Sequence, residues 1–551
     1  MLAIRKPPVP PARLLALVAF SVGTFLILPL ALRFALPDRF FADHAAAADQ
    51  LGRVNFPTSC APQAQPGLEK GLALLHSFQY TQAKETFGAA AKQDPQCAMA
   101  YWGRAMAHYH ELWDFPQPGT LQDGLRDIQQ AEKQNAPTER ERAYISAAAT
   151  FYQADAKLTQ EQRTAAYSAA MAKLHQLAPE DVEAAELYAL SLIALAEQDV
   201  AARSNRLAAM AILKPIFEQQ PNSPGAAHYL IHAADTPEFA VQGLAAARAY
   251  AKIAPDSSHA IHMPSHIFNR LGLWQESIAS NIAASASAEH ATDMHMAEAH
   301  YQTHAMDYLD YAYLQSGQEG KARAVAEAEM NVHGSTEEDN LDHRALLEAR
   351  NAVELHRWKE AASLKVPEVR ELWQDTTYWA RAIGAARSGD ISGAQKDVEK
   401  LTKIVALRDE HNRSEGYKVS EEKATDLREA EAWLAFAEGN SAAAIAELTV
   451  AAEHEEKEGA ESVRMPAREM LADLYEEMKK PAEALAAYET ALKYSPNRFD
   501  ALYGAGLAAK AGGDTTVSQN YFAKLSAIAD PVADRPELAE LKAQAAPRPP
   551  A

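Results

Sequence analysis

Residues Met465–Arg498 carry the pattern that decides the fold class, and they read MPAREMLADLYEEMKKPAEALAAYETALKYSPNR. Ala472, Ala484 and Ala491 place small side chains where two neighbouring helices have to approach each other closely. Pro496 follows the second helical run, and proline cannot continue a helix because it lacks a backbone N–H and clashes with the preceding turn. The stretch therefore predicts two helical runs, the second of which ends near Pro496.

The length and spacing of this unit resemble the tetratricopeptide repeat (TPR), and this resemblance implies a 34-residue hairpin of two antiparallel helices. Equivalent frames begin at Ala64, Pro224, Ser258 and Phe499, and looser frames begin near Thr303, Asp342, Asp375 and Thr425. One repeat cannot bury its apolar face alone, so stacked repeats share a continuous core. The resemblance implies an all-α, right-handed α-solenoid of about ten helical hairpins, whose first helices line a concave groove.

The 551-residue chain is acidic, with a formal net charge of −21. Sequence-independent binding to nucleic acid needs clustered Lys and Arg side chains, and the sequence shows no such stripe. We therefore expect no nucleic-acid partner. The oligomeric state is left open.

A long apolar run, Leu14–Leu32, follows Arg5, Lys6 and Arg13 near the N-terminus. Its 19 residues approach the roughly 20 that cross a bilayer, whereas a cleaved signal peptide usually has a shorter apolar region. Positive residues before a span stay in the cytoplasm, so we expect one transmembrane helix with the bulk of the chain outside the cytoplasm. The alternative is cleavage near Ala45–Ala48 followed by secretion.

The sequence predicts four segments along the chain. They are a cytoplasmic tip and anchor over 1–37, a linker over 38–66, a TPR solenoid over 67–530 with a His-rich part at 224–314, and a partly disordered tail over 531–551.

Cys60 and Cys97 are the two cysteines of the chain, and both follow the apolar run. An even pair in an oxidising compartment permits a disulfide. The bridge would tie the segment before the first repeat to the end of that repeat. Two unrelated small residues are the alternative.

Histidines gather in the middle of the chain, where nine of the 19 fall between His228 and His304. In the frames from Pro224 and Ser258, His228 and His232 take the same positions as His262 and His266. Residues four apart share one helical face. The other groups that we expect at this groove are Asp235, His259, Asn269, His300, His304, Asp307, Tyr311 and, from a later frame, Trp379.

Two His pairs on neighbouring helices can supply four nitrogen ligands, and His304 on the next helix a fifth. Imidazole suits Zn, Cu, Fe or Ni, so His228, His232, His262, His266 and His304 are the candidate ligands of a divalent transition metal. A thiolate zinc site is excluded because no cysteine lies nearby, and no H-E-x-x-H motif is present. The alternatives are a peptide groove without metal, a pH-responsive groove, and structural hydrogen bonding.

Pro264 falls inside the first helix of the frame from Ser258. It predicts that this helix either starts late, near Met263, or bends there. His259 and His262 would then lie on irregular backbone.

The stretch HYLIH at 228–232, followed by HAIHMPSHIF at 259–268, resembles a group of exported bacterial TPR-containing proteins. The resemblance extends to GLALLHSF at 71–78 and CAMAYWG at 97–103. It implies TPR architecture and a site at the histidines, without naming a reaction. From the resemblance together with the apolar run and the positive residues before it, we expect a bacterial inner-membrane protein whose bulk faces the periplasm. A scaffold that binds a peptide or protein in its groove is the first functional hypothesis; a metal-binding protein or metal-dependent enzyme is the second.

Overall fold

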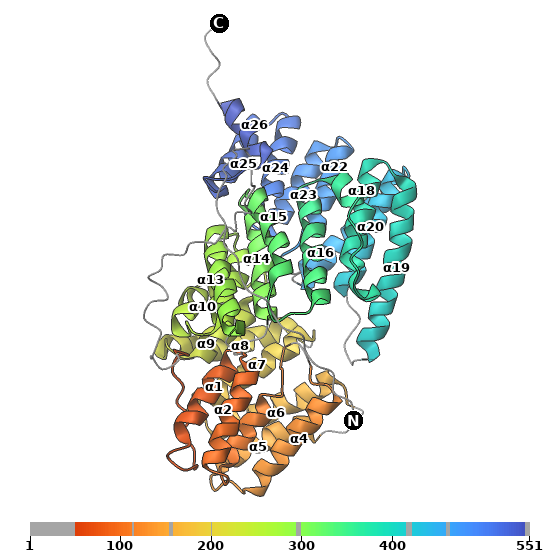
Figure 1. The fold of residues 1–551 in the computed structure, drawn as a ribbon. Coiled ribbons are helices and arrows are strands. Elements are labelled where there is room, and N and C mark those ends of the chain that lie inside the picture. Colours follow the sequence, from red (N-terminus) through yellow and green to blue (C-terminus); the bar gives the residue numbers. More distant parts are fainter. Residues whose placement is uncertain are drawn as a thin grey trace, which may run out of the picture. The chain divides into compact units, whose positions relative to one another are not determined.

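The computed structural model describes residues 50–112, 115–153, 158–199, 201–293, 299–414, 421–458 and 463–545, and within these ranges every regular element is a helix (Figure 1). The first eight are α1 (Gln65–His76), α2 (Tyr80–Gln93), α3 (Ala98–Met106), α4 (Pro118–Lys133), α5 (Glu139–Tyr152), α6 (Gln160–Leu177), α7 (Val182–Glu197) and α8 (Ala202–Gln219).

The central part of the chain carries the histidines. Its helices are α9 (Pro224–Ala234), α10 (Ala240–Ile253), α11 (Ser258–His262), α12 (Pro264–Arg270), α13 (Trp274–Asp293), α14 (His300–Gln315) and α15 (Glu319–Ala328).

The C-terminal part consists of helical pairs and one last helix. These are α16 (Glu337–Glu354), α17 (Trp358–Ala362), α18 (Asp375–Ser388), α19 (Ile391–Ser414), α20 (Glu421–Ala437), α21 (Ser441–Glu458), α22 (Ala467–Glu477), α23 (Pro481–Tyr494), α24 (Phe499–Ala511), α25 (Thr515–Ile528) and α26 (Pro536–Ala545). Short 3-10 turns occupy Glu329–Asn331 and Glu371–Trp373.

Small residues let the two helices of a pair approach each other. Ala472, Ala484 and Ala491 are buried between α22, α23 and their neighbours. Gly103 faces the ring of Phe87, where an added Cβ would lie 2.4 Å from a ring carbon. The expectation of an all-helical repeat fold is confirmed. With α11 and α12 taken as one interrupted helix, the described residues contain twelve pairs, α1/α2 to α24/α25, where the sequence indicated about ten.

The segment before the first repeat packs against the middle of the chain. The Arg53 N–H donates to the Asn222 carbonyl oxygen at 2.8 Å. Gly52 has φ +87°, and an added Cβ would lie 2.9 Å from Asn222 O and from Pro224 Cδ, so only glycine fits there. Phe56 is also buried. Residues 50–66, which the sequence assigns to a linker, are thus part of the packed fold.

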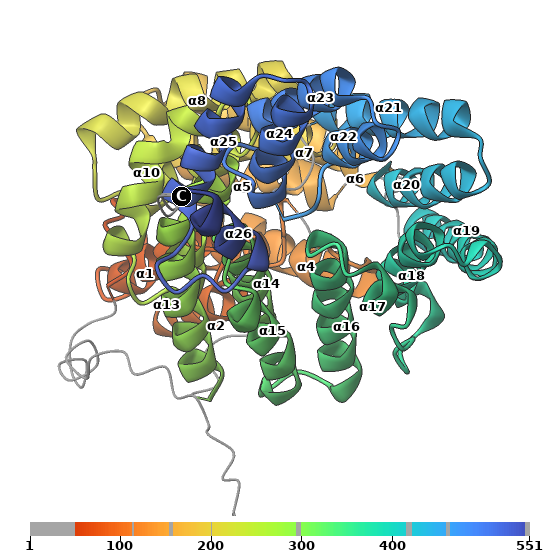
Figure 2. The same ribbon diagram turned by 90° about the horizontal axis from the view of Figure 1, so that it is seen from above.

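The C-terminal repeats return to the central ones (Figures 1 and 2). The Trp274 indole N–H donates to the Asn497 carbonyl at 2.7 Å, and the Asp534 N–H donates to the Gly317 carbonyl at 2.9 Å. Arg498 is fully buried and pairs with Glu354 at the end of α16 and with Glu469 in α22.

The predicted transmembrane helix at 14–32 lies outside the described residues. Among the residues that the structure does describe, no helix has the length and apolar character needed to cross a membrane. At the other end, α26 occupies part of the segment that the sequence assigns to a partly disordered tail.

Cys60 and Cys97 form a disulfide in the structure. Cys97 also caps α3, because its sulfur accepts a hydrogen bond from the Ala100 N–H at 3.3 Å. The bridge joins the segment before α1 to the start of the second helical pair.

Candidate metal centre

Three imidazoles from α9 and α11 converge on one point. The Nε2 atom of His228 lies 3.1 Å from Nε2 of His232 and 3.1 Å from Nε2 of His259. These three residues, here called the inner triad, are all buried. Their geometry would let three nitrogen atoms bind one ion.

A second triad lies next to the first. His262 of α11, His266 of α12 and His304 of α14 place one nitrogen each within 4.8 Å of one another. The Nε2 atoms of His262 and His266 are 3.1 Å apart. We call these three residues the outer triad, because His304 is exposed and His266 is partly exposed.

The two triads are neighbours in space. The ring centroids of His232 and His266 are 6.4 Å apart, and those of His259 and His262 are also 6.4 Å apart. Six imidazoles from three successive repeats thus form one continuous cluster. The inner triad includes His259, which the sequence analysis assigned to the groove but not to the metal ligands.

Pro264 interrupts the helical segment that carries three of the six rings, those of His259, His262 and His266. α11 ends at His262, Met263 links the two segments, and α12 starts at Pro264. The predicted break is therefore present, yet His262 and His266 still point toward each other. The break changes the backbone without separating their side chains.

The other ring nitrogen of His228 is held by the first repeat. Its Nδ1 lies 2.6 Å from the carbonyl oxygen of His76, at the end of α1. A carbonyl oxygen only accepts, so Nδ1 carries the proton and Nε2 of the neutral ring keeps its lone pair.

The outer triad has the same arrangement. His262 Nδ1 lies 2.7 Å from Asn281 Oδ1, and the Asn281 amide is oriented by its Nδ2 donating to the Ser277 carbonyl. His266 Nδ1 lies 2.9 Å from Asp235 Oδ2. Both Nε2 atoms are therefore unprotonated in the neutral rings. Such oxygen acceptors behind ligating histidines fix the tautomer and raise ligand basicity at metal sites.

Asp235 is held as a carboxylate. Burial alone would raise its pKa, but the charge of Arg270 and the hydrogen bond from His266 lower the pKa well below the usual value. Arg270 Nε donates to Asp235 Oδ1 at 2.8 Å. The anion that orients His266 is thus itself balanced by a cation.

Burial favours the neutral form of the inner triad and of His262 in the outer triad. It lowers the pKa of His228 to about 3, and it lowers the pKa values of His232, His259 and His262 well below their usual range, with the neighbouring rings adding to the effect. Neutral imidazole is the form that binds metal ions.

Several aromatic rings cover the inner triad. The Phe78 ring centroid lies 4.4 Å from that of His228, 5.6 Å from that of His232 and 5.6 Å from that of His259. Tyr250 also stacks on His228, with ring centroids 5.1 Å apart. Sequence reasoning missed Phe78, although it belongs to the quoted 71–78 stretch. Asn281 and Tyr308 were missed as well, and no local pattern marks them.

Two predicted groove residues lie near the cluster without joining it. Asn269 is buried and accepts a hydrogen bond from the Ser277 hydroxyl at 2.6 Å. His300 is exposed at the start of α14, with its ring centroid 4.1 Å from that of Tyr301. Neither supplies a nitrogen or oxygen to the triads.

Three further residues predicted at the groove, Asp307, Tyr311 and Trp379, lie outside the two triads. Asp307 pairs with Arg350 at 2.5 Å, and the Tyr311 hydroxyl donates to a backbone carbonyl at 3.2 Å. Trp379 is buried, and its indole N–H donates to Glu429 at 2.8 Å. Asp307 and Trp379 line one cavity together, and none of the six histidines lines it.

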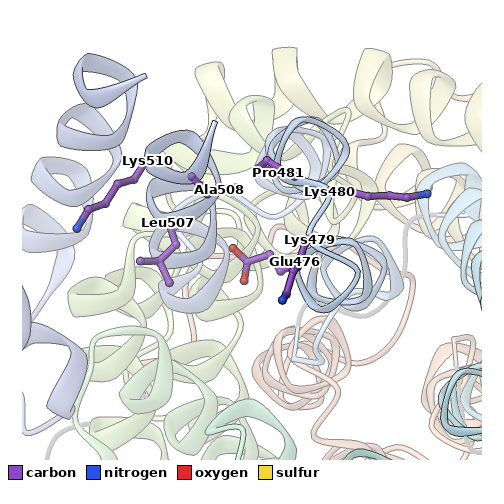
Figure 3. A pocket seen from close by; sticks show the side chains of 8 residues that line it. Glu476, Lys479, Lys480, Pro481, Leu507, Ala508 and Lys510 are labelled. Carbon is purple, nitrogen blue, oxygen red and sulfur yellow. The ribbon is translucent and has the colours of Figure 1, made fainter. Parts of the chain in front are cut away.

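A further hollow lies between α22, α23 and α24 and is lined by Glu476, Lys479, Lys480, Leu507 and Lys510, with the Lys480 and Lys510 side chains extending away from Glu476 (Figure 3). Burial raises the pKa of Glu476 to about 7. This hollow contains no histidine and is separate from the triads.

Residues 68–140 and 469–525 match the family model described as tetratricopeptide repeat. The chain carries TPR repeats. The matches cover the first helical pairs and α22 to α25, and the six histidines lie between the two matched regions. A TPR array of this kind suggests a protein-interaction scaffold.

A comparison with curated proteins found no match. Similar solved structures include human IFIT1 with PPP-AAAA, 14% identical over 79% of this chain and 91% of that chain with a TM-score of 0.35. Another is a TPR protein from Parabacteroides merdae, 15% identical over 52% of this chain and 98% of that chain with a TM-score of 0.29. At these scores the likenesses do not bear on ligand or function.

Proposed function

We propose that this protein binds transition-metal ions at the two histidine triads. The observation that carries the proposal is the 3.1 Å contact between Nε2 of His262 and Nε2 of His266, whose Nδ1 protons are both given to oxygen acceptors. Two lone pairs facing each other at this distance repel, and a cation between them removes the repulsion.

The inner triad supports the same proposal. His228 Nε2 has one lone pair in the ring plane, yet Nε2 atoms of two other histidines lie 3.1 Å from it. One lone pair accepts one hydrogen bond in good geometry. A metal ion satisfies all three nitrogens at once, whereas a proton satisfies one contact.

The donor set indicates the class of metal. Six imidazole nitrogens with no thiolate suit Zn, Cu, Fe or Ni and do not suit Mg or Ca, which prefer oxygen ligands. Three protein nitrogens leave a coordination position on each ion, as in catalytic metal sites. An ion in the outer triad could bind a water molecule at this free position and activate it. A metal-dependent hydrolytic reaction is therefore compatible with the outer triad.

The test is metal analysis of the full chain, purified without a His tag and reconstituted with Zn²⁺ or Cu²⁺. We expect stoichiometric metal in the wild type and its loss in the double variant His232→Ala, His266→Ala. The matched control is His333→Ala, His411→Ala, two exposed histidines outside the cluster. Circular dichroism monitors the helices. A wild type that binds no metal after reconstitution would refute the proposal. The close nitrogen contacts in each triad would then be explained by a shared proton.

A second candidate function is a scaffold for a protein or peptide partner, anchored in a membrane and facing the periplasm. The TPR match favours the scaffold, and the cavity lined by Asp307, Arg350 and Trp379 offers paired charges beside an aromatic face. Pull-down from envelope extract tests it, with Leu346→Glu at the same cavity as the variant expected to release the partner. A partner retained equally by that variant would place binding elsewhere.

A further inference from the structure

We propose that the two triads hold ions with different tasks. The ion of the inner triad is sealed from solvent, whereas the ion of the outer triad is accessible to solvent and takes a small anion as its further ligand. This inference rests on the proposed metal binding. It adds which of the two ions meets the ligand, and what charge that ligand carries.

The inner triad is sealed. His228, His232 and His259 have exposed fractions of 0%, 6% and 3%. The ring of Phe78 packs against all three imidazoles, and Tyr229 and Tyr250 pack against His228. An ion held there would exchange with solvent only after these rings move.

Phe78 is held firmly in this position. It has φ +54°, a left-handed conformation that is uncommon for a bulky residue. Its carbonyl oxygen accepts a hydrogen bond from the Tyr301 hydroxyl at 2.7 Å, and its side chain is almost fully buried. The equivalent turn residues His356 and Lys479 have the same left-handed conformation, so it belongs to the turn between paired helices. At Phe78 this turn places a ring against the three imidazoles.

The outer triad is accessible. His304 is exposed, and the side chain of His266 is 12% exposed. The Tyr308 hydroxyl lies 3.1 Å from His266 Nδ1, and its ring is 4.6 Å from the His266 ring. A ligand from solvent therefore reaches the ion of the outer triad first, beside a phenol group.

Charge decides the class of ligand. All six imidazoles are neutral ligands, so each bound ion keeps its full positive charge. Among the groups that hydrogen-bond these rings, the His76 carbonyl and the Asn281 amide are neutral, and Asp235 is already paired with Arg270. Arg206 donates to the His232 carbonyl at 2.7 Å, and its charge is balanced by Glu197, so the excess of positive charge comes from the bound ions. A loaded centre with this excess of positive charge attracts a small anion, such as hydroxide or the anionic group of a substrate.

The experiment uses the full chain loaded with Co²⁺, whose visible spectrum reports its ligands, and azide as the anion. We expect two Co²⁺ per chain, biphasic release to excess chelator with the slow phase at least tenfold slower, and an azide-induced spectral change that saturates at one ion. His304→Ala is expected to lose the fast phase and the azide response. His259→Ala is expected to lose the slow phase and keep the azide response.

Phe78→Gly separates sealing from folding, because glycine accepts the left-handed backbone while the ring is removed. We expect this variant to bind two Co²⁺ and to release the slow ion at least tenfold faster. Two ions released at one rate, or an azide response that survives in His304→Ala, would overturn the inference even if metal binding stands. Absence of bound cobalt in the wild type would instead refute the proposed function.

Discussion

The Nδ1 atom of His266 lies 2.9 Å from Oδ2 of Asp235, and this bond links the start of α12 to the end of α9. Asp235 comes three residues after His232 of the inner triad, while His266 belongs to the outer triad. One carboxylate therefore connects two successive repeats and orients a candidate ligand of the second. If the outer triad binds an ion as proposed, Asp235 is a positioning residue for it.

Asp235→Asn is expected to weaken metal binding at the outer triad by about 10–100-fold, the usual effect of removing such an orienting carboxylate. Competition with a chromophoric chelator measures it. Glu238→Gln, at an exposed ion pair with Arg203, is the control and is expected to change affinity less than about twofold. Equal affinities in the wild type and Asp235→Asn would show that Asp235 does not orient a ligand.

The metal-free protein is expected to lose stability on acidification. The unfolded His228 ring takes up a proton below about pH 6.5, whereas the folded ring stays neutral to about pH 3. The unfolded state thus binds more protons in this window, so the free energy of unfolding falls as the pH decreases, by about 2 kcal/mol at pH 5 for this ring. Urea unfolding in EDTA at pH 7.5 and pH 5 measures the difference.

His228→Gln provides the comparison, because glutamine does not titrate. We expect its loss of stability between pH 7.5 and pH 5 to be smaller than that of the wild type by roughly that amount. The remaining buried histidines still contribute to both proteins. An unchanged pH dependence would mean that the ring is not buried in its neutral form.

Reduction of the disulfide is expected to destabilise the fold. Cys60 and Cys97 are 37 residues apart, and closing a loop of this length contributes about 4 kcal/mol through the unfolded state. Urea unfolding with and without reductant measures the change. Cys60→Ala, Cys97→Ala should unfold at the reduced midpoint under both conditions. A wild type insensitive to reductant would indicate that the bridge does not form.

Arg498→Met is expected to cost about 3–5 kcal/mol, because it leaves the buried Glu354 and Glu469 carboxylates without their partner. Burial raises the pKa of Glu469, and the charge of Arg498 opposes this shift and favours the carboxylate. The double variant with Glu469→Gln should recover part of the loss, since one buried charge is removed. Arg203→Met, at an exposed pair, should cost less than about 1 kcal/mol. Equal effects of the two arginine variants would contradict this assignment.

The repeat fold could be read from the sequence because its determinants are local. Ala472, Ala484 and Ala491 recur at the spacing that brings two helices together, and Pro496 ends the second helix. The same periodicity put His228 and His262 at equivalent positions, and the predicted interruption at Pro264 is present. Helical period and proline chemistry act over a few residues, so neither needs the tertiary structure.

The composition of the candidate metal centre was decided by tertiary structure. Phe78 and the His76 carbonyl reach His228 from about 150 residues earlier in the chain, and Asn281 reaches His262 from the following helix. Contacts of this kind depend on how far each repeat is rotated against the others, which a repeat frame does not specify. For the same reason, the repeat frame placed Trp379 at the groove but did not predict that its indole N–H donates to Glu429, 50 residues later in the chain. Local spacing determined which helices form, and the stacking of distant repeats determined which side chains meet.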